Sequence, residues 1–395
     1  MQFVNSFLKI SLDISAVMWY NYIKVGDTMS YSDNTRVLSL SDLNGEKREI
    51  TIRYYDGTKL LSLSDLNGEK PEIYICTGNR TAGKTTYFNR LMVNRYLNNG
   101  SKFALLYRYN YELKGSASKF FDDIRGLFFR DHYMTEKSMA KGAFYQLKMD
   151  DKVCGFSIAL NSADIVKKYS HVFNEVDAIL FDEFQSEANR YCPEEITKFR
   201  SIHTSIARGQ GKQVRYVPVY MLSNTVSIIN PYFVEMGISN RLKSETKFLK
   251  GNGYVLEQTF NETASQAQLS SGFNRAFCGA NNYGAYAAQN VYLNDNTSFI
   301  DKPEGKPRYL CTLKYNGNNF ALKEFVDYGF VYCDDRPDLT FSTKISVTTE
   351  DHAINYVMLQ RNDMFLAQMR YLFEHGCFRF KNLLCKEAVL KALSY

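Results

Sequence analysis

The sequence predicts an α/β fold in which a P-loop domain with a mostly parallel sheet precedes a smaller α+β domain. The first observation is a glycine-rich loop, Gly78–Thr85, between an apolar run at 73–77 and a segment with helical spacing. The second is the alternation of short apolar runs with amphipathic helical segments through residues 71–260. The third is an apolar strand that ends in two adjacent acids, Asp182 and Glu183. Such alternation indicates a sheet with helices on both faces.

Length and composition limit the classes of protein. The 395 residues, 45% hydrophobic and 15% aromatic, are enough for two domains. The net charge of +6 is compatible with a nucleic-acid partner but does not by itself predict one. The 8 cysteines include no C-x-x-C pair, which favours reduced thiols in a cytosol. No apolar run reaches the roughly 18 residues of a membrane span, so no membrane partner is predicted.

The glycine-rich loop matches the pattern G-x-x-x-x-G-K-[ST] for binding nucleotide phosphates. Its residues are Gly78, Asn79, Arg80, Thr81, Ala82, Gly83, Lys84 and Thr85, and Thr86 follows them. Backbone N–H groups and the start of the following helix bind phosphate oxygens in such loops. Lys84 would reach the β- and γ-phosphates, and the Thr85 hydroxyl would bind Mg²⁺. The prediction is therefore a site for ATP and Mg²⁺, and the alternative is a turn with a surface lysine.

The elements of residues 71–262 follow from short apolar runs and helical spacing. We expect strands at 73–77, 103–107, 144–147, 155–160, 176–181, 214–222 and 247–260, and helices at 87–97, 120–129, 162–168 and 194–206. The third and fourth strands should form a hairpin through Asp150-Asp151. Ser162 is predicted to cap its helix.

The acidic pair after the 176–181 strand is the partner that a phosphate loop requires. Asp182 would hold Mg²⁺ together with Thr85. Glu183 would orient and deprotonate the water that attacks the γ-phosphate. A Glu directly after the Asp favours a hydrolysing, ASCE-type ATPase, in which an additional strand lies in the centre of the sheet. The alternative is an ordinary acidic turn at a strand end.

Three further polar residues are candidates for contact with the nucleotide. Asn224 follows the 214–222 strand, which should lie beside the phosphate loop, and it would sense the γ-phosphate. Arg80 lies inside the loop, and Arg208 follows the 194–206 helix. An arginine stabilises the charge that spreads over the transferred phosphoryl oxygens. From the residues alone, a surface or loop-stiffening role is favoured for both arginines.

The flanking regions predict three more segments: an extension at 1–70, a helical linker or lid at 263–294 and the α+β domain at 295–395. Ten residues of the extension, Leu38–Lys47, recur unchanged as Leu61–Lys70, and each copy contains Asn-Gly, which predicts a small hairpin. In the linker, Leu269, Phe273 and Phe277 have helical spacing. For the last domain we expect strands at 309–315, 320–328 and 329–333, and helices at 352–373 and 383–393.

Longer blocks of the sequence resemble the DNA encapsidation ATPases of small protein-primed podophages of the phi-twenty-nine type, which are terminase-like motors. The resemblance covers residues 71–395. The blocks are the phosphate loop with Arg80 in third position, Tyr107-Arg108-Tyr109 with Glu112-Leu113 and Phe120-Phe121-Asp122, Phe181–Phe184, Leu222–Ser227 with Asn230–Phe233, Tyr315-Asn316-Gly317, Thr348–Asp351 and Phe378–Phe380. The Ser-Asn…Asn-Pro-Tyr-Phe block is much more specific than a phosphate loop.

The resemblance implies a homopentameric ring on the portal vertex of an empty prohead that pumps double-stranded DNA with ATP. It implies that the last domain is a vestigial RNase H-like nuclease that docks on the prohead and, as in the type member, on a structural RNA. Arg208 would be a finger supplied in trans, with Arg200 and Arg215 as alternatives, and Arg80 would act on nucleotide or between subunits. The protein would work in the host cytoplasm, transiently on the prohead, and would be absent from the mature virion.

Other functions and other sites are less consistent with these residues. A P-loop kinase or a non-packaging, nucleic-acid-stimulated ATPase would use the same loop, although Asp182-Glu183 argues against the kinase. A docking protein with an inert ATP site is disfavoured by the intact loop and acids. A GTP switch would need an Asn-Lys-x-Asp motif, which the chain lacks. A nuclease would need clustered carboxylates, and we expect the last domain's acids at 327, 334, 335 and 338 to be solvated turn residues instead.

Overall fold

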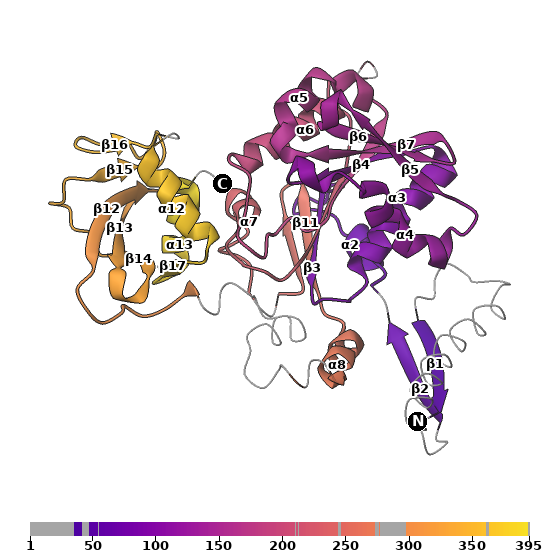
Figure 1. Ribbon diagram of the computed structural model, residues 1–395, viewed down its shortest axis with the longest axis horizontal. Coiled ribbons are helices and arrows are strands. Elements are labelled where there is room, and N and C mark those ends of the chain that lie inside the picture. Colours follow the sequence, from indigo (N-terminus) through magenta and orange to yellow (C-terminus); the bar gives the residue numbers. More distant parts are fainter. Residues whose placement is uncertain are drawn as a thin grey trace, which may run out of the picture. The chain divides into compact units, whose positions relative to one another are not determined.

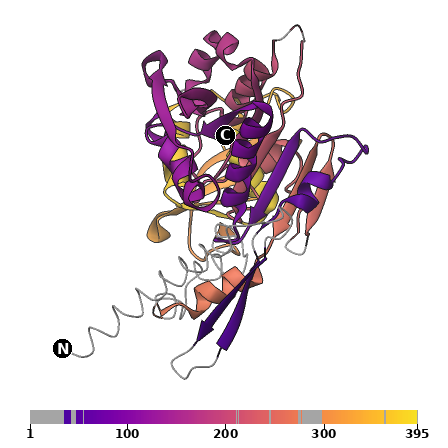
Figure 2. The same ribbon diagram turned by 90° about the vertical axis from the view of Figure 1, so that its right-hand side faces the viewer.

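The computed structural model describes residues 35–41, 47–53, 55–209, 211, 213–243, 246–272, 276, 298–360 and 363–393. Contacts divide the chain into two units, residues 1–54 and residues 55–395. In the first unit, β1 (Thr35–Ser41) and β2 (Lys47–Arg53) pair antiparallel (Figure 2). The strands predicted around the first repeat copy are confirmed, and their Asn44-Gly45 turn lies outside the described residues.

Residues 55–70 belong to the second unit, so its boundary lies at 54/55 and not at residue 70 as the sequence suggested. The side chain of Leu60, in helix α2 (Thr58–Ser62), is fully buried. The Tyr55 hydroxyl donates to Glu257 at 2.7 Å. This packing joins the segment to the sheet of the P-loop domain.

The second repeat copy does not form the predicted hairpin. Leu61 and Ser62 end helix α2, and a turn follows at Leu66-Asn67. The Asp65 carboxylate accepts from the N–H groups of Asn67 and Glu69 and, from a distant loop, of Gly253. These contacts satisfy the backbone of the segment without a partner strand.

A nine-stranded sheet forms the centre of the P-loop domain (Figure 1). Its strands are β3 (Ile73–Gly78), β4 (Lys102–Tyr107), β5 (Met134–Met139), β6 (Phe144–Met149), β7 (Lys152–Ala159), β8 (Val176–Phe181), β9 (Val219–Asn224), β10 (Phe248–Gly251) and β11 (Tyr254–Thr259). The order is β10-β11-β3-β9-β8-β4-β7-β6-β5. Pairing is parallel from β11 to β7 and antiparallel at both edges. Strand β9 lies between β3 and β8, which confirms the additional central strand.

Helices cover both faces of this sheet because side chains alternate along each strand. The helices are α3 (Lys84–Asn99), α4 (Ser116–Phe128), α5 (Ala163–Lys168), α6 (Glu195–Ala207) and α7 (Pro231–Glu235). On β8, Ala178 and Leu180 pack in the cluster that includes α3 and α4. Ile179 and Phe181 pack in the cluster that includes α5 and α6.

Several predicted bounds in this domain need correction. Strand β9 begins at Val219 and not at residue 214, because Pro218 has no N–H to donate to a neighbouring strand. The predicted 247–260 strand is two antiparallel strands joined by a turn at Gly253, whose φ is 76°. Strand β5 was not predicted. Ser162 precedes α5, but its hydroxyl donates to Asn110 and does not cap the helix.

The last domain contains a six-stranded sheet in the order β16-β15-β12-β13-β14-β17. Its elements are β12 (Arg308–Tyr315), β13 (Asn318–Phe325), β14 (Phe330–Asp334), β15 (Lys344–Ser346), β16 (Val357–Met358), α12 (Met364–Glu374), β17 (Phe378–Phe380) and α13 (Leu383–Ala392). The hairpin at Asn316-Gly317 is confirmed, with φ of 48° and 73°. The helix predicted from residue 352 begins only at Met364, where the Asp363 carboxylate caps it at 2.7 Å.

The linker begins with helix α8 (Glu262–Ser270), which includes Leu269. Its N-terminus is capped by Asn261, which accepts from the N–H of Ala264 at 3.0 Å. Phe273 and Phe277, predicted to continue the helical spacing, lie outside the described residues. Within the described part of the chain, no helix has the length and apolar character to cross a membrane.

Candidate active site

The phosphate loop connects β3 to α3, as predicted, and the residues around it hold it in place. The buried Asn79 side chain donates to the carbonyl of Asn261 at 3.0 Å and accepts from its N–H at 2.9 Å. Thr81 and Gly83 have φ of 59° and 91°, which turns the chain tightly into α3. In the described structure, α3 begins after Gly83 with no side-chain cap and no acid in its first turn. The N–H groups at this end can therefore bind an anion.

Lys84 is buried and lies back over its own loop. Its ammonium group donates to the carbonyls of Gly78 at 3.2 Å and Asn79 at 2.8 Å. Burial lowers the pKa of Lys84 below its usual range. A buried cation with neutral carbonyl partners gains from an anionic partner, because charge-assisted hydrogen bonds are the stronger ones. The loop therefore fits a phosphate group.

Asp182 and Glu183 follow β8 directly and face the start of α3. The Thr85 hydroxyl donates to Asp182 at 2.7 Å, and Thr86 is half-buried in the next position of α3. Burial raises the pKa of Asp182, while its bonds to Thr85 and to the Glu183 N–H oppose that shift. Burial, followed by Asp182 and Glu187, also raises the pKa of Glu183. A hydroxyl beside a carboxylate is a donor set that suits Mg²⁺, so this pair fits the expected metal ion.

A carboxylate that the sequence did not reveal, Glu187, joins two predicted residues. The Arg80 guanidinium pairs with Glu187 at 2.5 Å, and the Asn224 amide donates to the same oxygen at 3.4 Å. Gly78 and Asn224 are partners in the β3–β9 register, so the end of β9 lies beside the loop as expected. No local pattern distinguishes Glu187 from other loop acids.

A cleft of about 250 Å³ opens beside the acidic pair, at the carboxyl ends of β4 and β8. Residues that line it include Thr85, Tyr107, Arg108, Lys119, Asp182 and Glu183. Ligands of open α/β sheets bind at this edge. Arg108 is the second residue that the sequence did not reveal, because its block was noted only for its resemblance.

The three arginines considered for a trans-acting role lie in different environments. Arg208 is exposed and follows the last residue of α6, about 20 Å from the start of that helix. Because Glu195 at the start of α6 contacts the active-site turn through Arg108, Arg208 is not brought to the site of its own chain. Arg215 is buried and donates to the carbonyls of Val176 and Ile206, which is a structural role. The Arg200 side chain is 74% exposed and lies 3.7 Å from Glu235.

The acids of the last domain differ from the prediction at one position. Asp334 is buried and pairs with Lys323 at 2.7 Å, so it is not a solvated turn acid. Asp327, Asp335 and Asp338 are exposed, as expected. Among the residues that the structure describes, no three His, Cys, Asp or Glu side chains form a group that could hold a metal ion.

The strand order and the loop–acid arrangement define the P-loop fold of the type in which an extra strand separates the loop strand from the acidic strand. Residues 51–393 match the family model of the podovirus DNA encapsidation protein (Gp16). The chain belongs to this family, which confirms the resemblance noted in the sequence.

Individual relatives agree with this assignment. The chain is 26% identical over 309 residues to a DNA packaging protein of Bacillus phage phi29, covering 77% of this chain and 88% of that protein. It is 24% identical over 315 residues to the DNA packaging protein of Bacillus phage B103, covering 78% and 92%. Its fold is similar to the solved phi-28 gp11 DNA packaging motor, with a TM-score of 0.52 and 18% identity over 87% of this chain and 98% of that one.

Proposed function

We propose that this DNA encapsidation protein is the ATPase of a genome-packaging motor, which hydrolyses ATP and so moves double-stranded DNA through the portal into a prohead. The observation that carries the proposal is the 2.7 Å contact between Thr85 and Asp182, with Glu183 next in the chain. It joins the phosphate loop to an acidic pair at the edge of the sheet where ligands bind. Family membership supplies the DNA-packaging context.

Each residue of the site has a defined task in this proposal. The N–H groups at the start of α3 and the Lys84 ammonium hold the triphosphate. The Thr85 hydroxyl and Asp182 hold Mg²⁺, which neutralises charge on the phosphate oxygens when it is bound. Glu183 accepts the proton of the attacking water. Asn224 and Arg80 are assigned to sensing the γ-phosphate of a bound nucleotide, and their shared contact with Glu187 supports this assignment.

The test is steady-state ATP hydrolysis by the full-length chain, with and without duplex DNA, beside Glu183→Gln. We expect duplex DNA to stimulate the wild-type chain and Glu183→Gln to bind ATP but lose about 10²- to 10⁴-fold of its turnover. Hydrolysis at the same rate with and without nucleic acid would favour another ATPase. Phosphate transfer to a small acceptor would favour the kinase. Unchanged hydrolysis by Glu183→Gln would exclude Glu183 as the base.

Arg208 is proposed as the finger that acts on the nucleotide of a neighbouring subunit in a homo-oligomeric ring, with five subunits as the expected number. Its exposure, and its distance from the site of its own chain, support action in trans. Arg208→Ala subunits mixed with Glu183→Gln subunits should recover hydrolysis, because each supplies the residue that the other lacks. Mixed rings, verified by mass, that stay inactive would contradict this role.

The last domain is proposed to dock on the portal vertex of the prohead and, in phages that carry one, on a structural packaging RNA. The motor would therefore act in the host cytoplasm and leave before the virion is complete. Binding of the full chain to isolated proheads, with and without RNase treatment, measures both contacts. If RNase treatment does not change binding, the RNA contact is contradicted and only docking on the prohead itself is supported.

A further inference from the structure

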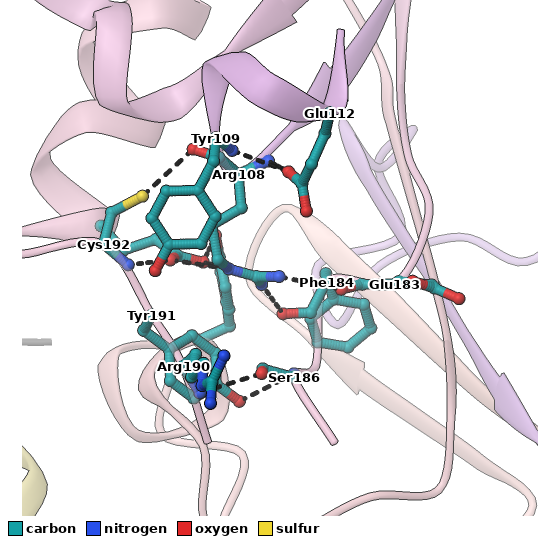
Figure 3. Close-up of polar contacts among 11 residues, drawn as sticks. Arg108, Tyr109, Glu112, Glu183, Phe184, Ser186, Arg190, Tyr191 and Cys192 are labelled. Carbon is teal, nitrogen blue, oxygen red and sulfur yellow. Dashed lines mark hydrogen bonds and ion pairs between the residues drawn. The ribbon is translucent and has the colours of Figure 1, made fainter. Parts of the chain in front are cut away.

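The Arg108 side chain lies between the catalytic turn after β8 and the segment that leads into α6 (Figure 3). It follows β4 directly and is only 8% exposed. The proposed ATP chemistry assigns no role to Arg108. Its side-chain donors face the carbonyls of Glu183 and Phe184 and the carboxylate of Glu195. Arg108 therefore connects the end of β4, the turn after β8 and the start of α6.

On one side, Arg108 holds the turn that carries the proposed base. One terminal nitrogen donates to the carbonyl of Phe184 at 2.7 Å, and the other lies 3.4 Å from the carbonyl of Glu183 (Figure 3). Glu183 has a φ of 56°, a left-handed conformation that non-glycine residues keep only when the surroundings enforce it. The Glu183 N–H donates to the Asp182 carboxylate at 2.9 Å, and Arg108 contacts the Glu183 carbonyl. Both backbone polar groups of Glu183 therefore have a side-chain partner.

On the other side, Arg108 is anchored by Glu195 at the start of α6. The Arg108 Nε–H lies 2.9 and 3.1 Å from the two carboxylate oxygens. The Cys192 N–H and the Tyr232 hydroxyl each donate to the same carboxylate at 2.7 Å. Glu195 is fully buried, so its position is determined by these partners.

The charge of Arg108 is balanced inside this network. Burial opposes the charged guanidinium, but Glu195 together with the neighbouring Tyr232 and Tyr191 outweighs that effect, and the pKa of Arg108 lies above its usual range. The rings of Tyr191 and Phe181 lie 5.1 and 5.6 Å from the guanidinium carbon. Because the charge is paired with Glu195, what Arg108 offers the catalytic turn is its two terminal donors in a rigid planar fork.

We propose that Arg108 is a positioning residue for hydrolysis: anchored by Glu195, it holds the Glu183 and Phe184 carbonyls and so aims the Glu183 carboxylate. The inference rests on the proposed function, because it requires Glu183 to act as the base. Arg108 acts through the backbone of Glu183 and has no contact with the nucleotide in this proposal. Misplacement of a reacting group by about 1 Å can cost on the order of 10²-fold in rate.

The test is Arg108→Lys, which keeps the positive charge beside Glu195 but lacks the planar fork. On proheads with saturating duplex DNA, we expect kcat for ATP to fall by roughly 10- to 100-fold while KM changes less than about twofold. The thermal midpoint should remain close to that of the wild-type chain. Arg95→Lys is the matched control, since Arg95 also donates to a carbonyl of β8, that of Asp177, at 3.3 Å. The control should keep wild-type kcat.

A double-mutant cycle separates positioning from a general structural effect. If Arg108 acts only through Glu183, Arg108→Lys should cause no further loss in a Glu183→Gln background. An additional tenfold loss there would overturn the proposal, as would wild-type kcat in the single variant or a KM increase that accounts for the whole loss. A wild-type chain that hydrolyses no ATP would instead refute the proposed function, so the two failures are distinct.

If Arg108→Lys does not fold, a milder variant tests the positioning role of Arg108. Tyr232→Phe removes one hydrogen bond from Glu195 and changes little else in the buried volume. It should lower kcat by about threefold at unchanged KM, because the bonds of Glu195 to Arg108 and Cys192 remain in place. Wild-type kcat for Tyr232→Phe would show that the Glu195 anchor does not control the catalytic turn.

Discussion

Strands β8 and β14 both end in acidic side chains, but the two sheets surround those acids in opposite ways. At the end of β8, Asp182 bonds a hydroxyl and a backbone N–H, and no ion pair joins Asp182 or Glu183 to another described residue. At the end of β14, both oxygens of Asp334 accept from the Lys323 ammonium, at 2.9 and 2.7 Å. The next acid, Asp335, pairs with Lys381.

The difference shows how a sheet edge can either keep an acid reactive or neutralise it. A partly desolvated carboxylate with no cation at ion-pair distance has a raised pKa, and it gains when a metal ion or an accepted proton arrives. A carboxylate with a lysine at hydrogen-bond distance already has its counterion, so a metal ion would have to displace that lysine. The site of the first sheet is therefore suited to chemistry, and Asp334 of the second sheet is suited to holding the fold together.

The largest expected effect comes from Asp182→Asn, which removes the negative charge but keeps the size of the side chain. We expect turnover of ATP to fall by about 10³-fold, because several kcal/mol of metal-dependent stabilisation are lost. The thermal midpoint should stay the same or rise, since the desolvation cost of the Asp182 charge is removed. Hydrolysis and thermal denaturation of the same preparation measure both. A lowered midpoint with retained hydrolysis would make Asp182 a structural residue.

The second expected effect is on stability and comes from Lys323→Met in the last domain. This change leaves the buried Asp334 without its cation, which should cost about 3–5 kcal/mol of unfolding free energy. Adding Asp334→Leu should recover most of the loss, because replacing both partners of a buried pair by apolar residues is often neutral. Urea unfolding followed by circular dichroism measures both, and nucleotide affinity is the control that should not change. If Lys323→Met were as stable as the wild-type chain, the pair would not neutralise this edge.

Local patterns predicted much of the catalytic edge. Strand β8 was predicted with its observed bounds, because its apolar run is short and two acids end it. The contact between Thr85 and Asp182 follows from the carboxyl ends of parallel strands meeting at one edge. Glu187 and the Arg108–Glu195 pair could not be predicted, because their partners are 107 and 87 residues away and no periodicity links them.

The repeated decapeptide shows the limit of local sequence most directly. The copy that begins at Leu38 contributes to the antiparallel pair of β1 and β2. The copy that begins at Leu61 ends a helix and turns, because the N–H of Leu66 donates to the carbonyl of Gly251 and Asp65 accepts from Gly253. The described residues of the first copy, 38–41 and 47, lie in strands, whereas the same residues of the second copy do not, and partners from distant loops decide the second structure.

The smallest expected effect on stability is at Asp335. This residue and its ion-pair partner Lys381 are exposed to a similar degree. Their side chains are 40% and 38% exposed, so solvent screens the pair and Asp335→Asn should cost at most about 0.5 kcal/mol. The hydrogen bond from Lys381 lowers the pKa of Asp335. A lowered pKa in the folded state stabilises the fold at neutral pH, and this contribution disappears as the pH falls through that pKa.

Unfolding curves at neutral and acidic pH test this surface pair, with Asp327→Asn as the control at another exposed acid of the same domain. The difference between the wild-type chain and Asp335→Asn should shrink on acidification and in high salt, because the charge of Asp335 and its screening both change. A loss above about 2 kcal/mol that persists at acidic pH would contradict a screened pair. Asp335 would then be, like Asp334, an acid whose lysine partner contributes substantially to the stability of this sheet edge.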